Sequence, residues 1–221
     1  MTTDVKKPVW KKWWFWVGAL IVVGAILPPN EKRNSGSSHS DVIAKRPADD
    51  VIAQRPADEA KFISIVSDAQ TKARVAANDM QKGGIKAERE KALCANMEKL
   101  QVSNWTGWVR SIDANSDGKG VLAVEIAKDI TVTTWNNDLS DIMHKTLLEP
   151  GSAVFSAASQ MKKRQAVTFS GSFSRGSEDE VECVYESSMS LDGKLLDPEF
   201  IMRFTHIEVF VPKAASPAKT S

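Results

Sequence analysis

Residues 104–135, NWTGWVRSIDANSDGKGVLAVEIAKDITVTTW, decide the fold. Within this stretch β-branched and aromatic residues alternate with polar ones, a pattern typical of strands that bury one face. The turn sequence NSDG at 115–118 separates two such runs. The stretch therefore predicts strands over 104–112, 120–128 and 130–135.

The alternating pattern returns after a gap of thirty residues. It predicts strands over 166–173, 181–191 and 200–211, with turn signals at 175–177 and 192–193. The gap itself reads as helical over 139–148 and 153–163. Three strands, a helical insertion and two or three more strands form the order of an OB-fold, which is a small closed barrel.

Four segments carry a resemblance to known proteins: WTGWV at 105–109, DGKGVL at 117–122, ITVTTW at 130–135 and QAVTFSGSF at 165–173. They resemble segments of uncharacterised bacterial membrane-anchored or exported proteins with an OB-fold-like domain, distantly similar to the tRNA-anticodon-binding-like group. The resemblance covers roughly residues 90–210. It implies an architecture, and because its motifs contain no catalytic residue it implies no activity.

The N-terminus contains an uncharged apolar run, WWFWVGALIVVGAIL at 13–27, with four lysines before it. The run alone is about 22 Å long as a helix, and the flanks from Pro8 to Pro29 extend it toward the roughly 30 Å of a bilayer core. We expect a cytoplasmic segment at 1–12 and a single transmembrane anchor at 13–29, because the basic flank stays inside. A cleaved signal peptide is the alternative. Both place the remainder in the periplasm, outside the cell membrane.

The next segment, 30–58, reads as a flexible linker that ends in a tandem repeat. The repeat is DVIAKRPAD at 41–49 and DVIAQRPAD at 50–58, which differ only at Lys45 and Gln54. The proline in each copy interrupts a helix. We interpret the repeat as a spacer that folding does not require, or as a short docking motif present twice.

Residues 59–100 have the composition of helices and are predicted to form a stalk of two helices, 59–82 and 85–100, which break at Gly83 and Gly84. The second helix has an apolar stripe, Leu93, Met97 and Leu100, which we expect to lie on the following domain.

The folded domain is then 101–211, and 212–221 is a disordered tail. The predicted fold class is mainly β: an OB-like small barrel preceded by a helical stalk and an N-terminal transmembrane helix.

Charge argues against nucleic acid as a partner. Residues 101–211 hold 10 Lys and Arg against 16 Asp and Glu, a net charge of minus 6. Phosphate contacts supply most of the affinity for nucleic acids, and they need basic residues. The basic cluster at 162–164 reads as a solvated helix end. Trp108 and Arg110, which share one face of the first strand, are the predicted contact surface.

No pattern predicts catalytic, cofactor-binding or metal-binding residues. Asp113–Gly118 matches the opening of a calcium loop, but Val124 stands where the loop needs Glu. The three histidines are far apart in the sequence. We therefore expect a non-enzymatic binding module of the bacterial envelope with an unknown protein partner. The alternatives are a single-stranded nucleic-acid-binding OB-fold at the cell surface and a hydrolase with an unrecognised site.

Cys94 and Cys183 are the only thiols, 89 residues apart. That spacing excludes a CxxC metal or redox motif, and an exported domain can oxidise such a pair. We predict a disulfide that ties the second helix to a late strand. Two buried free thiols are the alternative.

Overall fold

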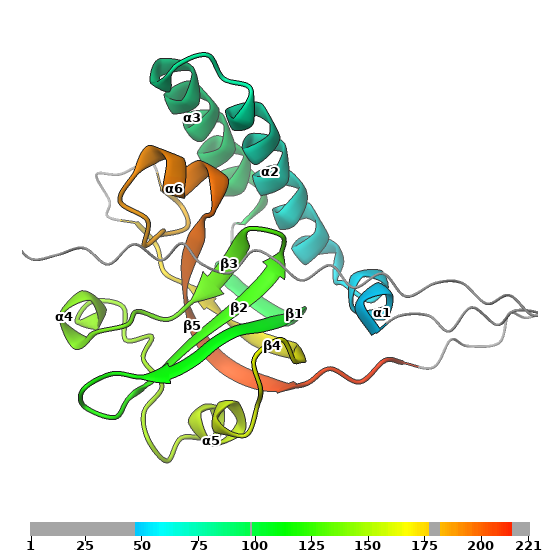
Figure 1. The fold of residues 1–221 in the computed structure, drawn as a ribbon, viewed down its shortest axis with the longest axis vertical. Coiled ribbons are helices and arrows are strands. Elements are labelled where there is room, and N and C mark those ends of the chain that lie inside the picture. Colours follow the sequence, from blue (N-terminus) through cyan, green and yellow to red (C-terminus); the bar gives the residue numbers. More distant parts are fainter. Residues whose placement is uncertain (1–46, 98, 177–181, 214–221) are drawn as a thin grey trace, which may run out of the picture. The chain divides into compact units, whose positions relative to one another are not determined.

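The computed structural model describes residues 47–97, 99–176 and 182–213 (Figure 1). Within them the helices are α1 (Pro47–Ala53), α2 (Ala57–Arg74), α3 (Asp79–Asn96), α4 (Asp138–Asp141), α5 (Ala153–Ser159) and α6 (Leu191–Leu196). The strands are β1 (Gln101–Ala114), β2 (Gly120–Ala127), β3 (Ile130–Thr133), β4 (Ala166–Phe173) and β5 (Glu199–Val209). About 36% of the structure is helix and about 30% is strand. It is therefore a mixed α and β fold, and the expectation of a mainly β chain applies only to the part after Leu100.

The five strands form one mixed sheet that closes on itself in the order β1-β2-β3-β5-β4. All neighbours are antiparallel except β3 and β5, which run parallel. β1 closes the ring because it pairs with both β2 and β4. Its residues Gln101 to Trp108 pair with β4, and Trp108 to Ala114 pair with β2.

Two glycines allow the strands to approach closely. A Cβ on Gly107 would lie 2.7 Å from the Glu125 carbonyl oxygen, and a Cβ on Gly171 would lie 2.6 Å from the Arg203 carbonyl oxygen. Both distances are shorter than van der Waals contact, so only glycine fits without a shift of the backbone. Bulges between Val102 and Trp105 and between Val109 and Ser111 curve β1 further.

Five of the six predicted strands are present with small changes at their ends. The predicted strand at 181–191 is wrong. Residues 182–190 make only an isolated bridge, Glu186 with Phe200, and Leu191 begins α6. The predicted turn at 192–193 lies inside α6, where the Gly193 amide donates to the Ser190 hydroxyl that caps the helix.

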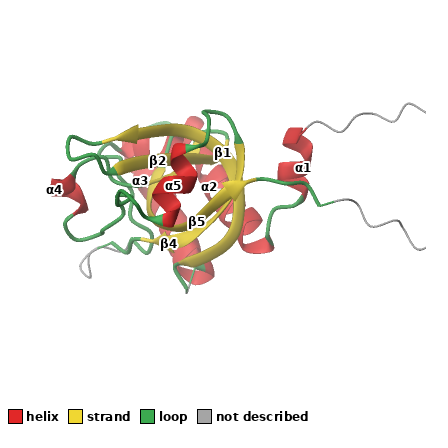
Figure 2. Cartoon of the chain, turned by 90° about the horizontal axis from the view of Figure 1, so that it is seen from below, coloured by secondary structure: helices red, strands yellow, loops and turns green. Residues whose placement is uncertain are grey.

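Helices cover the two ends of the ring of strands. α2 and α3 lie above it in Figure 1, and Figure 2 looks onto α5 with the strands around it. From α2, Phe62 enters the core and its ring centre lies 4.9 Å from that of Phe200 and 5.3 Å from those of Trp105 and Phe173. α5 supplies Ala158 to the same core. The segment expected as a stalk is therefore part of the folded core.

The predicted break between the two long helices is wrong by several residues. Gly83 and Gly84 lie inside α3, and the actual break is at 75–78. Asn78 caps α3, because its side chain accepts a hydrogen bond from the Gln81 amide at 3.0 Å. The apolar stripe is confirmed: Leu93 and Met97 are buried in the core, and Leu100 packs against it.

The linker expected over 30–58 does not extend to Asp58. Residues 47–58 form α1, a short connection and the start of α2, and Val51 is fully buried. The second repeat copy therefore belongs to the folded unit, because its apolar and charged side chains contact β1 as described below.

No helix in the described parts of the chain is both long and apolar enough to cross a bilayer. The segments predicted as a cytoplasmic N-terminus at 1–12 and an anchor at 13–29 lie outside the described residues, as does the tail after Lys213.

Candidate binding groove

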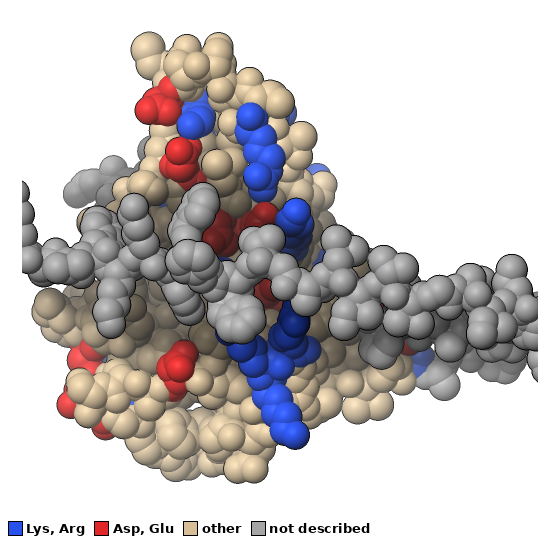
Figure 3. Space-filling model, in the orientation of Figure 1, with Lys and Arg blue, Asp and Glu red and all other residues tan. Residues whose placement is uncertain are grey.

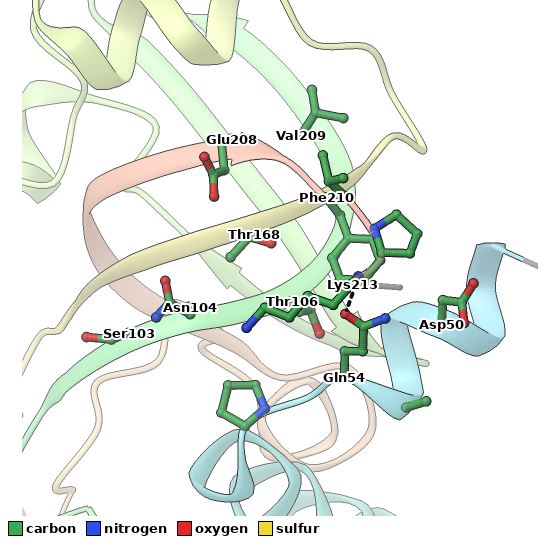
Figure 4. A pocket seen from close by; sticks show the side chains of 14 residues that line it. Asp50, Gln54, Ser103, Asn104, Thr106, Thr168, Glu208, Val209, Phe210 and Lys213 are labelled. Carbon is green, nitrogen blue, oxygen red and sulfur yellow. Dashed lines mark hydrogen bonds between the residues drawn. The ribbon is translucent and has the colours of Figure 1, made fainter. Parts of the chain in front are cut away.

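A groove of about 1260 Å³ separates α1 from the sheet (Figure 4). Its walls come from α1, the start of β1, the middle of β4 and the chain after β5. The polar residues that line it are Asp50, Gln54, Ser103, Asn104, Thr106, Thr168, Glu208 and Lys213. Hydroxyl and amide groups and charges of both signs thus face one open space.

Gln54 joins the two ends of the described chain at this groove. Its Oε1 accepts a hydrogen bond from the backbone amide of Lys213 at 3.0 Å, the dashed line in Figure 4. The chain after β5 is thereby held against α1, so the two ends of the folded unit meet at one place.

The opposite wall contains an irregular part of β1. Ser103 and Asn104 leave the ladder with β4, and Asn104 has a φ of 57°. Asparagine tolerates this left-handed conformation better than most residues. The Asn104 amide donates to the Ser170 hydroxyl at 3.0 Å, which replaces the lost ladder bond.

A buried carboxylate network lies beneath the groove. Glu59 is fully buried, and its Oε2 accepts from the Thr106 amide at 2.8 Å while its Oε1 lies 3.2 Å from the Arg55 Nε. Arg55 also donates to the Ile126 carbonyl oxygen. Burial raises the pKa of Glu59 to about 7, although the Thr106 hydrogen bonds and the Arg55 charge oppose the rise.

Asp58 extends this network into the aromatic core. Its Oδ2 accepts from the Trp105 indole Nε1 at 2.9 Å. Arg55 and Asp58 belong to the second repeat copy, and each contacts a different strand or core residue. The repeat copy is therefore a structural clamp between α2 and the sheet.

The predicted contact surface, Trp108 and Arg110, lies on the outer face of β1. Both residues are half-buried. The Arg55 guanidinium lies 6.0 Å from the centre of the Trp108 ring. Arg110 donates to the Thr131 hydroxyl at 2.6 Å and pairs with Asp197 at 3.4 Å. The structure thus places both residues on the surface, but it surrounds them with partners from the same chain.

The predicted disulfide between Cys94 and Cys183 is present, with the two Cα atoms 5.3 Å apart. It joins α3 to the connection between β4 and α6, since the strand expected there is absent. An ionic cluster lies beside it: Arg89, fully buried, pairs with Glu90 at 2.6 Å and with Glu186. Burial raises the pKa of Glu186 to about 7, and the Arg89 charge opposes the rise.

The acidic turn at 113–118 is organised by Asn115. Its Oδ1 accepts from the amides of Asp117 and Lys119 at 3.1 and 2.9 Å. The side chain that would be a calcium ligand is thus used to close the turn. Across the described parts of the chain, no group of three or more His, Cys, Asp or Glu side chains is placed to hold a metal ion.

Sequence reasoning missed Glu59, Gln54 and Arg55. The repeat was a signal for Arg55, which corresponds to Arg46 in the first copy, but not for Gln54, which stands at the one position where the two copies differ. Nothing in the sequence distinguishes Glu59 from an exposed residue at the start of a helix, where acidic residues are common.

The chain matches no protein-family profile, no curated protein and no solved structure. The residues and geometry described above are therefore the basis for any functional argument.

Proposed function

We propose that this chain is a membrane-anchored, non-enzymatic binding module that displays an OB-like domain on the outer side of the bacterial cell membrane. The observation that carries the proposal is the Cys94–Cys183 disulfide. Disulfides persist in oxidising compartments and are rare in the cytosol. The bond agrees with the export expected from the basic and apolar N-terminal sequence.

The strand order supports the OB-like part of the proposal. Three sequential antiparallel strands, a helix before β4 and a β1–β4 pairing that closes the ring are the features of this architecture. The parallel β3–β5 pair follows from the same order.

The proposed ligand for the groove is an extended segment of an envelope protein. The groove is large and open, and its lining combines hydroxyls, amides and charges of both signs with apolar side chains such as Val209, Phe210 and Val211, a mixture that suits the alternating groups of a peptide.

A periplasmic reporter enzyme fused after Ser221 tests the location. We expect the fusion to be active, and a matched fusion that lacks residues 1–29 to be inactive. An inactive full-length fusion of normal abundance would contradict the proposal.

Site-specific photocrosslinking tests the groove. A photoreactive amino acid at Thr168, inside the groove, should crosslink to an envelope protein in cells. The same amino acid at Arg164, an exposed residue outside it, is the control. Equal crosslinking from both positions would show that the groove is not the binding site.

Single-stranded nucleic acid is a second candidate ligand. Figure 3 shows Lys and Arg side chains in a band along the face of α2 and onto the part of the molecule below it. Trp108 lies near Arg55 in the same domain, and stacking on aromatic residues between basic ones is typical of single-strand binding. The pairing of Arg110 with Asp197 and the negative charge of the domain oppose this candidate. Retention on single-stranded DNA that falls steeply with salt would favour it.

A further inference from the structure

A second cavity, of about 550 Å³, lies at the far end of β4 from the groove. Its residues come from four places: the chain after α4, the end of β4 and the residues that follow it, the segment near the disulfide, and β5. They are Met143, His144, Ser172, Phe173, Ser174, Arg175, Gly176, Tyr185 and Arg203. The volume lies within the range of small-molecule sites, roughly 300 to 1,000 Å³.

Among the described residues, the lining of the cavity contains two arginines and no carboxylate. Arg175 and Arg203 are exposed, and neither side chain has a hydrogen-bond or ion-pair partner among the described residues. Arg89 and Arg110, by contrast, are held by carboxylates. Within the described parts of the chain these two guanidinium groups therefore keep their donors available, although the domain has a net charge of minus 6. Planar guanidinium groups favour phosphate and carboxylate oxygens.

Aromatic rings form the other side of the cavity. The Tyr185 ring centre lies 5.0 Å from the His144 ring centre, and Trp135 lies behind them at 5.9 Å from both. The three rings are tilted against one another by 39° to 57°, so a planar ligand ring can stack on the face of one of them and contact the edge of the next. The cavity therefore has one charged side and one aromatic side.

The backbone at Tyr185 is held by hydrogen bonds to two other segments of the chain. Its amide donates to the Ser174 carbonyl oxygen at 2.9 Å, and its carbonyl oxygen accepts from the Ile201 amide at 2.8 Å. Two residues earlier, Cys183 is bonded to α3. A preorganised wall lowers the entropy cost of binding.

We propose that this cavity binds a phosphate monoester that carries a planar ring, with the phosphate on Arg175 and Arg203 and the ring against Tyr185 and His144. The inference rests on the proposed function, since it assigns a ligand class to the binding module. Ser172 and Ser174 supply hydroxyl donors between the two parts of the ligand. The mononucleotide AMP has both parts and serves as the probe.

Calorimetric titration of the purified full chain with AMP, ribose 5-phosphate and adenosine tests the proposal. We expect AMP to bind at least about tenfold more tightly than either fragment, because each fragment lacks one of the two contacts. No AMP binding at concentrations up to about 10 mM, or equal affinity for AMP and adenosine, would overturn the proposal.

The double variant R175Q R203Q tests whether these two arginines bind the phosphate. Both side chains are exposed, so the variant should unfold at the same temperature as the parent chain while its affinity for AMP falls at least about tenfold. R164Q removes an exposed arginine outside the cavity and should leave the affinity unchanged. Equal losses in the two variants would show a general effect of charge and would overturn the assignment.

Tyr185→Ala tests the aromatic side. It should reduce the preference for AMP over ribose 5-phosphate without changing the affinity for ribose 5-phosphate. An unchanged preference would overturn the stacking contact. These titrations use purified protein, so they can fail while the reporter fusion shows the expected location, and the reverse also holds.

Discussion

The indole N–H of Trp105 donates a hydrogen bond to the carboxylate of Asp58, with 2.9 Å between Nε1 and Oδ2, across 47 residues of sequence. Trp105 is fully buried in the barrel core, whereas Asp58 is the last residue of the second repeat copy. The bond therefore attaches a segment with the composition of a spacer to the centre of the fold.

Trp105→Phe should destabilise the domain by about 1 to 4 kcal/mol, since it removes the donor to Asp58 and replaces the indole by a smaller ring in the fully buried core. Trp108→Phe is the matched control, because the Trp108 ring is half-buried on the outer face. Urea denaturation measures both. Equal effects would show that the indole N–H of Trp105 contributes nothing specific.

Deletion of residues 50–58 should leave the free energy of unfolding within about 1 kcal/mol of the parent value. The deletion joins DVIAKRPAD directly to Glu59, so Val42, Arg46 and Asp49 would take the positions of Val51, Arg55 and Asp58.

Deletion of both copies, 41–58, removes the clamp and should cost several kcal/mol, because a buried valine and a buried arginine contact are lost together, each worth about 1 to 3 kcal/mol. If the single and double deletions unfold alike, the first copy does not replace the second. A chain that starts at Glu59, which the sequence alone suggested would be sufficient, should show the same loss.

Stability should fall as the pH rises from about 4.5 to about 7, the interval between the ordinary and the folded-state pKa of Glu59 and Glu186. In this interval the folded chain binds more protons than the unfolded chain, so each group favours the folded state most at low pH and least above about 7.

Glu59→Gln removes one of the two groups and should reduce the slope of the free energy of unfolding against pH by about half. The slope should not disappear, because Glu186 remains. The exposed Glu88→Gln controls for the loss of a charge. An unchanged slope in the Glu59 variant would contradict burial of an ionisable Glu59.

The double substitution Cys94→Ser and Cys183→Ser should lower the free energy of unfolding by as much as about 4.6 kcal/mol, the loop-entropy value for 89 residues. Because the ionic contacts of Arg89 persist, the segment should remain near α3 in the folded state. Thiol titration of the denatured, unreduced protein checks the bond: a monomer with two reactive thiols per chain would refute it.

Gly171→Ala should destabilise the domain by about 1 to 3 kcal/mol, because its Cβ would meet a backbone carbonyl oxygen at 2.6 Å. Gly84→Ala is the matched control inside α3, where no atom lies within 4 Å of the added Cβ. It should stabilise the helix by about 0.5 to 1 kcal/mol. Thermal unfolding distinguishes the two signs, and an unchanged or raised stability of the Gly171 variant would contradict the close packing at Gly171.

Alternation and turn chemistry were sufficient to predict the strands that form ladders. β4 alternates strictly between buried and half-buried residues, and β3, which is buried throughout, was predicted from its β-branched residues and the turn before it. The error at 181–191 has a physical cause. Glu182, Val184 and Glu186 are buried while Cys183 and Tyr185 are half-buried, so the period of two exists. This alternation of burial arises from contacts with α3 and from the disulfide. Strand pairing contributes only one isolated bridge in this segment.

The helix boundary at Asn78 could have been predicted. Asn78 and Gln81 form a reciprocal cap, in which the Gln81 side chain also accepts from the Ala77 amide at 2.8 Å. This spacing is a known start signal. Gly83 and Gly84 have low helix propensity, and for this reason the sequence predicted a helix break there. The break lies elsewhere, because an eighteen-residue helix tolerates two glycines when neighbouring turns pack well.

Neither the groove nor the cavity could be predicted from the sequence. Arg175 and Arg203 are 28 residues apart in the chain and come together only because β4 and β5 pair with Ser172 opposite Arg203. The partners of Arg110 likewise lie on other elements. Local patterns predict which face of an element is buried, but they carry no information on which side chains from distant elements meet.

The Gln54–Lys213 hydrogen bond affects how the domain would respond to a pulling force. A pull applied through the N-terminal side of the chain reaches α1 before any strand, so the load falls first on the contacts of Val51 and Arg55 and on the Gln54–Lys213 hydrogen bond. Peeling α1 away would open the groove and release the end of the chain together. The Cys94–Cys183 bond would meanwhile keep α3 fastened behind it. Tension applied to the chain before α1 would therefore expose one wall of the groove before it reached any strand.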